Sequence, residues 1–454
     1  MNKGIWVRAN VFLFHYWSVV CFWKIRIIFC VLVWISLLVI ANNQDHNRNN
    51  LNLNYDTSSS ISNSDSSSPH SKLNLIQSNV LQKTTLTHLQ CKQNPSYGQD
   101  ESVSKQLSEI NRKEYQNKWK DYLKQNTIKY ELAKWGARSK SIVTSYNPKH
   151  FSRIKFLLNY IRNYLNCQLS IEIFYYGDEI NTLQHQVLIE FGEVYMRDIS
   201  SVVNYSVGSG RGFALKSGAL LNSFAEQNLW LDSDNIPLRD PSYLFDSAEF
   251  KSTGAIFWPD YWHQSISNPV FDILNVTCYH EQYQQESGQL LVDRSIHWES
   301  LKLSYYINEN SDLYYRFFLG DKESFHLAWK ALNSPFYFIH KWLSPVGFME
   351  SNGRFCGHAM LQYDYNHQPL FLHANLLKSF EKSTFLNNKY WTHIQRYVAD
   401  IDNPDLEATV IGRENDQKGL CVVLHKEELS SVIESFEQLV PDFNKIFSKF
   451  GGIV

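Results

Sequence analysis

The stretch GFALKSGALLNSFAEQNLWLDSDN, residues 212–235, decides the fold of this chain. Its first half carries apolar residues at helical spacing, and the apolar run Leu229–Leu231 that follows is typical of a short buried strand. The strand ends at Asp232, after which Pro237 and the pair Asp240-Pro241 break regular structure. A helix that leads into a buried strand predicts part of an α/β sheet.

The same alternation precedes this stretch. Residues 141–146 (SIVTSY) form a β-rich run, residues 150–165 (HFSRIKFLLNYIRNYL) have helical periodicity, and residues 169–177 (LSIEIFYYG) form a second strand candidate. The order strand, helix, strand predicts a βαβ unit. We therefore expect an α/β fold built from at least two such units.

The sequence Asp232-Ser233-Asp234 follows the predicted strand directly. In open α/β sheets, ligands collect at the carboxyl ends of the strands, where this turn would lie. Two aspartates separated by one residue can direct oxygens toward one hard cation, which then bridges the phosphates of a nucleotide sugar. The alternative is an ordinary loop or helix cap, because such pairs occur by chance, but the strand before and the turn after favour a metal site.

The N-terminal part predicts a membrane anchor. Residues 27–41 (IIFCVLVWISLLVIA) carry no charge, and the apolar character extends back from there, interrupted only by Lys24 and Arg26. Positive residues precede the span and NNQD follows it, so the N-terminus is expected in the cytosol, as in a type II protein. A cleaved signal peptide is the alternative, which the long lead and the missing small-residue cleavage pattern disfavour.

These patterns divide the chain into regions. Residues 42–104 are rich in Asn, Ser and Gln and predict a disordered lumenal stalk, because few large apolar side chains are present to offset the entropy of ordering. Charged and apolar residues then alternate at helical intervals through SEINRKEYQNKWKDYLKQ. The predicted regions are 1–24 (cytosolic lead), 25–41 (membrane span), 42–104 (stalk), 105–138 (helical lead-in) and 139–454 (catalytic domain).

Composition excludes some partners. Lys and Arg number 43 and Asp and Glu 45, giving a net charge of −2, so no basic field attracts a nucleic-acid backbone and nucleic acid is not expected as a partner. The five cysteines beyond the apolar N-terminal stretch show no zinc-ligand spacing; they allow one or two disulfides in an oxidising lumen and leave at least one unpaired. The glycosylation sequons Asn204-Tyr205-Ser206 and Asn275-Val276-Thr277 agree with a lumenal position.

Residues 216–262 (KSGALLNSFAEQNLWLDSDNIPLRDPSYLFDSAEFKSTGAIFWPDYW) resemble the fungal Golgi α-mannosyltransferase family, whose members add α-1,2- and α-1,3-linked mannose. The resemblance continues in 286–298 (ESGQLLVDRSIHW), 320–332 (GDKESFHLAWKAL) and 355–378 (FCGHAMLQYDYNHQPLFLHANLLK). It implies a glycosyltransferase A-type, Rossmann-like fold, a retaining reaction, GDP-mannose as donor, Mn²⁺ as cation, a glycan or glycoprotein acceptor, and a Golgi membrane location with the catalytic domain in the lumen.

The resemblance also implies metal and donor ligands. Asp232 and Asp234 match the metal-binding aspartates, and His373 resembles the C-terminal histidine that completes the metal site, a role that imidazole suits. His373 could instead be a hydrogen-bonded core histidine, and His358 is a rival for the same role. Lys216 matches a family position from which its ammonium group could reach the donor phosphates, although a solvated helix lysine is an alternative.

Two further segments provide candidate catalytic and donor-binding residues. Glu286-Ser287-Gly288-Gln289 is expected in a small-residue turn, with Gln289 contacting sugar hydroxyls and Glu286 as the residue to test for catalysis. A purely structural turn is the alternative. Asp321 is expected at the N-cap or first turn of a helix, where the resemblance also places the acceptor, and it is the second catalytic candidate.

The C-terminal residues 387–454 match no motif, and residues 427–439 (EELSSVIESFEQL) predict a helix. Three functions are compatible with these patterns. The first is transfer of mannose from GDP-mannose to a mannoside. The second keeps the fold and uses a UDP-sugar, since a metal site binds phosphates rather than the base or the sugar. The third is an inactive glycan-binding Golgi protein, which the intact pair of aspartates disfavours.

Overall fold

The computed structural model describes residues 107–125, 130, 134–177, 181–201, 211–265, 267–278, 283–385, 387, 389–397, 408–424 and 431–452. These residues all belong to the second of two units into which the chain divides, Thr85–Val454. The predicted membrane span, the stalk and the sequon at Asn204 lie outside the described residues. Among the helices that are described, none is both long and apolar enough to cross a membrane.

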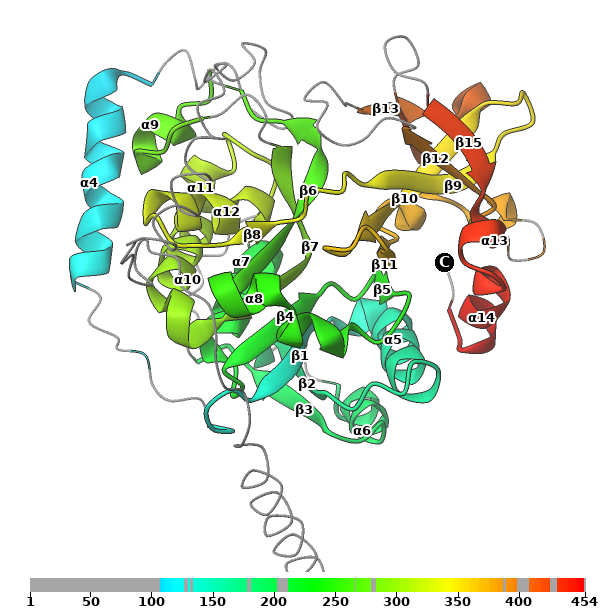
Figure 1. Cartoon of the computed structure of the whole chain (residues 1–454), viewed down its shortest axis with the longest axis horizontal. Coiled ribbons are helices and arrows are strands. Elements are labelled where there is room, and N and C mark those ends of the chain that lie inside the picture. Colours follow the sequence, from blue (N-terminus) through cyan, green and yellow to red (C-terminus); the bar gives the residue numbers. More distant parts are fainter. Residues whose placement is uncertain are drawn as a thin grey trace, which may run out of the picture. The chain divides into compact units, whose positions relative to one another are not determined.

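A seven-stranded sheet organises the first part of this unit (Figure 1). Strands β3, β2, β1 and β4 pair in parallel with one another, whereas β7 runs antiparallel to both β4 and β6. The sheet is therefore mixed, and the predicted α/β class and the strands expected at 141–146, 169–177 and 229–231 are confirmed. In spatial order the strands are β3 (Val194–Asp198), β2 (Ser170–Tyr175), β1 (Lys140–Ser145), β4 (Gln227–Leu231), β7 (Tyr283–Asp293), β6 (Ala255–His263) and β8 (Tyr337–Phe338).

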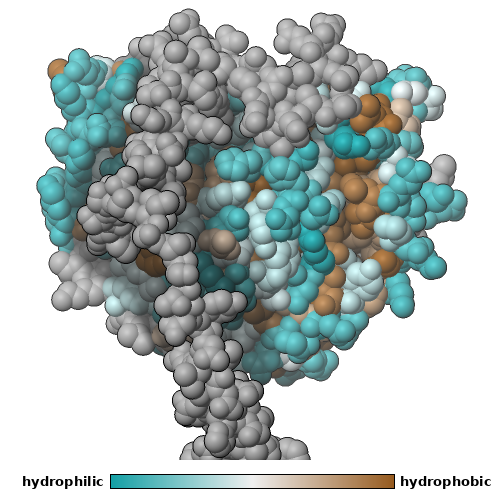
Figure 2. Space-filling view, viewed as in Figure 1, coloured by the Kyte–Doolittle hydropathy of each residue, from teal (hydrophilic) through white to brown (hydrophobic). Residues whose placement is uncertain are grey.

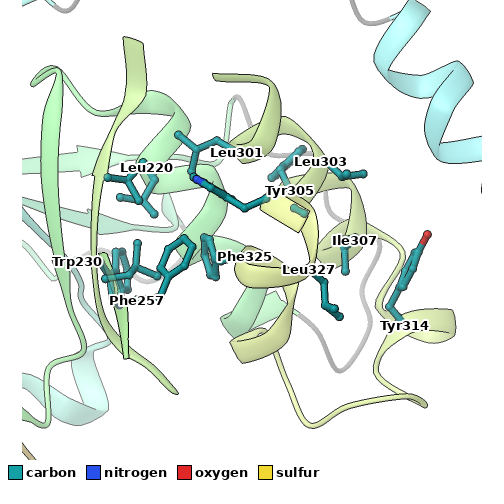
Figure 3. Packing of buried hydrophobic residues seen from close by; sticks show 14 of the residues in the cluster. Leu220, Trp230, Phe257, Leu301, Leu303, Tyr305, Ile307, Tyr314, Phe325 and Leu327 are labelled. Atoms are coloured by element: carbon teal, nitrogen blue, oxygen red, sulfur yellow. The ribbon is translucent and has the colours of Figure 1, made fainter. Parts of the chain in front are cut away.

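Helices cover both faces of this sheet, which explains why its strands read as continuous apolar runs. On one face, Trp230 of β4 packs with Leu220 and Leu301, and Figure 3 shows this core between the sheet and the helices. On the other face, Leu229 and Leu231 of β4 pack with residues of α5. The connecting and covering helices are α5 (Phe151–Asn163), α6 (Thr182–Ile189), α7 (Arg211–Asn222), α8 (Ala248–Thr253), α10 (Arg294–Glu309), α11 (Ser311–Tyr314) and α12 (Lys322–Ala331).

The predicted helical lead-in is present as α4 (Glu109–Gln125). It buries a single side chain fully, Trp119, whose indole N–H donates to the carbonyl of Ile273 in α9 (Val270–Leu274) at 2.9 Å. Most of its exposed surface is polar, as Figure 2 shows along the edge where α4 lies. Tyr115 and Leu123 of the same helix are partly buried and pack against the core, so Trp119 is the deepest of several contacts that attach α4 to the domain.

A second sheet carries the C-terminal part of the chain. Its strands are β13 (Ala408–Gly412), β14 (Leu420–Leu424), β10 (Phe355–Tyr363), β9 (Ser344–Met349), β12 (His393–Tyr397) and β15 (Ser431–Ser435), in that spatial order. Strand β11 (Pro369–His373) pairs with β10 and also with the short β5 (Asn235–Pro237), which follows the two aspartates. The pairing of β5 with β11 places a C-terminal segment beside the turn that follows β4.

The helix predicted for residues 427–439 is wrong over most of its described part. Residues 431–435 form strand β15, which pairs with β12, and only Phe436–Leu439 are helical as α13. The β-branched pair Val432-Ile433 suits a strand, and pairing with a distant partner decided against the local helical pattern. The last helix, α14 (Phe443–Lys449), packs Phe447 against Trp391, so the unassigned C-terminus is an integral part of the second sheet's core.

The described cysteines include both disulfide-bonded and free residues. Cys356 of β10 and Cys421 of β14 form a disulfide that joins two neighbouring strands across 65 residues. Cys278 is also disulfide-bonded. Cys167 is a free, buried thiol, and burial raises its pKa to about 12, so it stays protonated. The free thiol of Cys167 agrees with the expectation that at least one of the five cysteines beyond the apolar N-terminal stretch is left unpaired.

Candidate functional site

The two aspartates lie in the turn that follows β4, at the edge where the parallel strands of the first sheet end. Two hydrogen bonds define this turn. The amide of Asn235 donates to the carbonyl of Asp232 at 2.9 Å, and the amide of Asp232 donates to the carbonyl of Gly288 in β7 at 2.8 Å. The carboxylates of Asp232 and Asp234 are consequently held at the sheet edge, and both side chains remain half-buried rather than enclosed.

His373 completes a cluster of possible metal ligands with the two aspartates. One ligand atom from each of Asp232, Asp234 and His373 lies within 4.8 Å of the others. The Nε2 atom of His373 is 3.2 Å from Oδ1 of Asp234 and 3.9 Å from Oδ2 of Asp232. The histidine arrives there because β11 pairs with β5, and the amide of Ala374 donates to the carbonyl of Asp234 at 2.9 Å.

The rival histidine lies elsewhere. His358 is fully buried in β10, and its Nε2 is 2.9 Å from the carbonyl oxygen of Tyr390. Burial lowers its pKa to about 4, as for a neutral core histidine. The structure therefore brings His373, and not His358, to the two aspartates.

The charges of the cluster are strongly coupled. Burial alone would lower the pKa of His373, but Glu286 and Asp234 outweigh it and raise that pKa to about 10. Burial alone would raise the pKa of Asp234, yet His373, Lys378 and Arg153 together lower it. The carboxylates of Glu286 and Asp234 thus lie on two sides of the His373 ring. A bound cation could balance their negative charge in place of the proton on that ring.

Lys216 is not a solvated helix lysine. Its ammonium group forms ion pairs with Oδ1 of Asp232 at 3.2 Å and Oδ2 of Asp321 at 3.1 Å. It also donates to the carbonyl oxygen of Ser287 at 2.6 Å and to its hydroxyl at 3.0 Å. Lys216 is 5% exposed, so its charge connects two carboxylates below the surface of the site. Burial lowers its pKa, but Asp232 and Asp321 outweigh this effect and raise it.

Asp321 precedes α12, as predicted for a helix cap, but its side chain makes no capping hydrogen bond. The carboxylate turns instead toward Lys216 and is 5% exposed. Burial raises its pKa, although Lys216 opposes the shift. Its position at the helix start is confirmed, and the capping role is replaced by the ion pair with Lys216.

The segment Glu286–Gln289 is part of strand β7 and not of a turn, which corrects the sequence-based expectation. Pairing of β7 with β4 continues here, with Gln289 opposite Leu231. Gln289 is fully buried and accepts a hydrogen bond from the side chain of Asn235 at 2.5 Å, so it lies behind the aspartate turn. Oε1 of Glu286 is 3.1 Å from Nδ1 of His373.

Two cations beside the aspartates were not identified from sequence. Lys378 and Arg153 lie 3.6 Å and 3.9 Å from Oδ2 of Asp234. Lys378 ends the stretch HANLLK, five residues after His373, which is a signal that sequence analysis could have used; Arg153 occupies a helix position with no such signal. Together they form one side of a small hollow lined by Arg153, Phe156, Ser233, Asp234, Ile236, Ala374, Leu377, Lys378 and Phe447.

Comparisons with known proteins point to one family. The family model described as "Mannosyltransferase putative" matches residues 139–285 and 276–364. The chain is 34% identical over 195 residues to the alpha-1,2-mannosyltransferase MNN24 of Candida albicans. This alignment covers 34% of this chain and 27% of the relative. The chain is 26% identical over 262 residues to the alpha-1,2-mannosyltransferase MNN2 of Saccharomyces cerevisiae. That alignment covers 47% of this chain and 44% of the relative. The chain therefore spans less than half the length of these relatives.

Solved structures show weaker likenesses. The mannosyltransferase Ktr4p from S. cerevisiae is 10% identical, with 48% of this chain and 74% of that chain covered and a TM-score of 0.30. The galactosyltransferase LgtC is 12% identical, with 44% and 72% covered and a TM-score of 0.32. The family match ends at residue 364, so His373 and Lys378 lie beyond it.

Proposed function

Because this chain belongs to the mannosyltransferase family whose model matches residues 139–285 and 276–364, we propose that it transfers mannose from GDP-mannose to a mannoside. The acceptor is a glycoprotein or a cell-surface glycan, the reaction retains the donor's anomeric configuration, and the new linkage is α-1,2 or α-1,3. Residues 139–454 form the catalytic domain, of the glycosyltransferase A type. The observation that carries the proposal is the convergence of Asp232, Asp234 and His373 at the end of β4.

The residues of this cluster fit a divalent cation. Two carboxylates and one imidazole form a donor set that suits Mn²⁺, and the half-buried aspartates leave its other coordination positions accessible to substrate oxygens. Asp232, Asp234 and His373 would hold the ion. When bound, it would balance the negative charge that develops on the diphosphate as the sugar departs.

The neighbouring side chains divide the remaining tasks. Lys378 is exposed and Arg153 is half-buried beside Asp234, so their positive groups are available to bind phosphate oxygens. Lys216, being enclosed, orients Asp232 and opposes the rise that burial causes in the pKa of Asp321. Asp321 is the carboxylate that we place nearest to the sugar chemistry, as nucleophile or as a group that stabilises positive charge at the anomeric carbon.

Nucleotide release tests the proposal directly. The full chain, purified in detergent, is incubated with Mn²⁺, a panel of mannoside acceptors, and either GDP-mannose or a series of UDP-sugars. We expect GDP release that depends on both Mn²⁺ and acceptor, and a mannosylated product whose linkage is read by NMR. Release of UDP from a UDP-sugar instead would favour the alternative donor, and no release from any donor would favour an inactive glycan-binding protein.

We further propose a Golgi membrane protein of type II, with residues 42–454 in the lumen. The uncharged run at residues 27–41 supports it, and so does the Cys356–Cys421 disulfide, because such bonds persist in oxidising compartments. The sequon residues Asn275 and Thr277 are both exposed, at the C-terminal end of α9.

Glycosylation of Asn275 reports this topology. In a eukaryotic host, an Asn204→Gln background should still show a mobility shift on endoglycosidase treatment. The shift should disappear in Asn275→Gln and Thr277→Ala, but not in Asn352→Gln, which changes an exposed asparagine outside any sequon. A protein that carries no glycan at Asn275 would contradict the lumenal placement.

A further inference from the structure

We propose that Glu286 is a positioning residue, which holds the His373 ring so that its Nε2 faces the cation, and that it is not the nucleophile of the transfer reaction. Strand β7 then serves as the support on which the metal-binding groups are arranged. The inference rests on the proposed function, because it assigns Glu286 a role toward the cation that Asp232, Asp234 and His373 would hold.

The first argument is the geometry of the imidazole ring. Oε1 of Glu286 lies 3.1 Å from Nδ1 of His373, whereas Nε2, on the other side of the ring, faces Asp234 at 3.2 Å. The Glu286–His373 contact is an ion pair that does not meet hydrogen-bond geometry here. A carboxylate on this side of the ring favours a proton on Nδ1, which leaves the lone pair on Nε2, where a metal ion needs it. The ring therefore lies between Glu286 and the aspartates.

The second argument is the space around Gly288. A β-carbon at this position would lie 2.5 Å from both Cε1 and Nδ1 of His373 and 2.9 Å from Oε1 of Glu286. The φ angle of Gly288 is not among the positive values found in the described residues, so glycine is required here for room and not for backbone freedom. The histidine ring rests directly on the glycine backbone.

The third argument is that the same short piece of β7 also fixes the aspartate turn. The carbonyl of Gly288 accepts from the amide of Asp232 at 2.8 Å, and Ser287 accepts from Lys216, which pairs with Asp232. Gln289 binds the side chain of Asn235, the residue after Asp234. Four consecutive residues of one strand thus each hold a different part of the metal-binding cluster.

The fourth argument concerns what Glu286 has left for catalysis. Its Oε1 also accepts the amide proton of Gly288 at 2.6 Å, so this oxygen already has two partners. The imidazole ring of His373 lies between Glu286 and Asp234. A nucleophile must reach the anomeric carbon of the donor, which is bound through its phosphates at the cation. Asp321 pairs with Lys216 and not with the histidine, so it is the remaining carboxylate to test for that role.

The test separates hydrogen bonding from nucleophilic attack by comparing two variants of the full chain. Glu286→Gln keeps an oxygen that can accept the Nδ1 proton but cannot form a glycosyl ester, whereas Glu286→Ala removes both functions. Mn²⁺ affinity is measured by the electron paramagnetic resonance signal of free Mn²⁺, and transfer is measured at saturating Mn²⁺. Glu350→Gln is the matched control, because it alters another buried carboxylate, paired with Arg354 in the second sheet.

We expect Glu286→Ala to bind Mn²⁺ about 10- to 100-fold more weakly, as is typical for loss of a group that orients a metal ligand. Glu286→Gln should lose less than about tenfold in affinity and keep most of its transfer rate once Mn²⁺ is saturating. Gly288→Ala should weaken Mn²⁺ binding as strongly as His373→Ala, because the added β-carbon displaces the ring. Glu350→Gln should bind Mn²⁺ like the wild type.

Two results would overturn the inference. One is wild-type Mn²⁺ affinity in Glu286→Ala; the other is complete loss of transfer in Glu286→Gln at saturating Mn²⁺ with its affinity unchanged, which is the behaviour of a nucleophile. If Glu286→Ala fails to fold, the Glu286→Gln result alone decides. A wild-type chain that binds no Mn²⁺ would refute the proposed metal site instead, so the two failures are distinguishable.

Discussion

Replacement of Lys216 by methionine tests whether this lysine holds the site together or serves the donor. Methionine is an unbranched side chain of similar length, but it removes the ammonium group that pairs with Asp232 and Asp321. The carbonyl and hydroxyl of Ser287 lose their donor at the same time. Two carboxylates then share one poorly solvated region without a balancing cation, and we expect the folded state to lose stability.

The magnitude follows from the distances. Ion pairs at 3.1 and 3.2 Å are each worth roughly 5 kcal/mol at an effective dielectric constant of about 20. The cost of burying the ammonium group, several kcal/mol, opposes this gain, and breaking one side of a buried pair typically costs about 3–5 kcal/mol. We therefore expect Lys216→Met to lower the free energy of unfolding by about 3–5 kcal/mol.

Urea unfolding in the presence of a metal chelator, followed by tryptophan fluorescence, measures this loss. The double variant Lys216→Met/Asp321→Asn should recover at least half of it, because the least solvated carboxylate is then neutral. Lys140→Met is the control, since Lys140 pairs with the exposed Asp246 at the surface and should cost no more than about 1 kcal/mol. A loss below about 1 kcal/mol in Lys216→Met, or no recovery in the double variant, would refute the reasoning.

Three other predictions concern the metal site, the disulfide and a buried acid. Asp234→Ala should abolish Mn²⁺-dependent transfer while the circular dichroism spectrum stays that of the wild type; unchanged activity would place the metal elsewhere. Replacing Cys356 and Cys421 by serine should lower the free energy of unfolding by about 4 kcal/mol, from the loop entropy of a 65-residue separation, and urea titration showing less than about 1 kcal/mol would contradict it. Burial raises the pKa of Glu323 from 4.5 to about 7. Between these pH values the folded state keeps a proton that the unfolded chain has lost. The free energy of unfolding should therefore fall by roughly 3 kcal/mol as the pH rises from 4.5 through 7. Glu323→Gln should flatten this pH dependence, and identical stability profiles for the variant and the wild type would disagree.

Local patterns determined the elements of the first sheet. The strands at 141–146, 169–177 and 229–231 are buried on both faces, so they appear in the sequence as short apolar runs bounded by turn residues. The helices between them show their periodicity for the same reason, since one face of each packs on the sheet. The position of Asp232 and Asp234 followed from these elements, because the turn lies directly after a strand that the sequence itself defines.

Contacts between distant residues determined the rest. Only the family resemblance favoured His373 over His358, because the position of each ring depends on β11 pairing with β5 across more than a hundred residues. The glycine of residues 286–289 suggested a turn, since glycine is common in turns, but its actual role is to leave room for a histidine that arrives from the second sheet. Likewise, Lys216 has helical neighbours in sequence, and only the tertiary structure brings Asp232, after β4, and Asp321, before α12, to its ammonium group.

The sequence by itself thus determined the α/β class and the strand-end pair of aspartates, because these depend on local hydrophobicity, charge and spacing. The tertiary structure alone decided which histidine joins the aspartates, which carboxylate is held by Lys216 and which by His373, and that residues 431–435 form a strand. Those outcomes depend on long-range pairing and on the burial of charge. A one-dimensional pattern contains neither quantity, because both arise only when separated segments exclude water from one another.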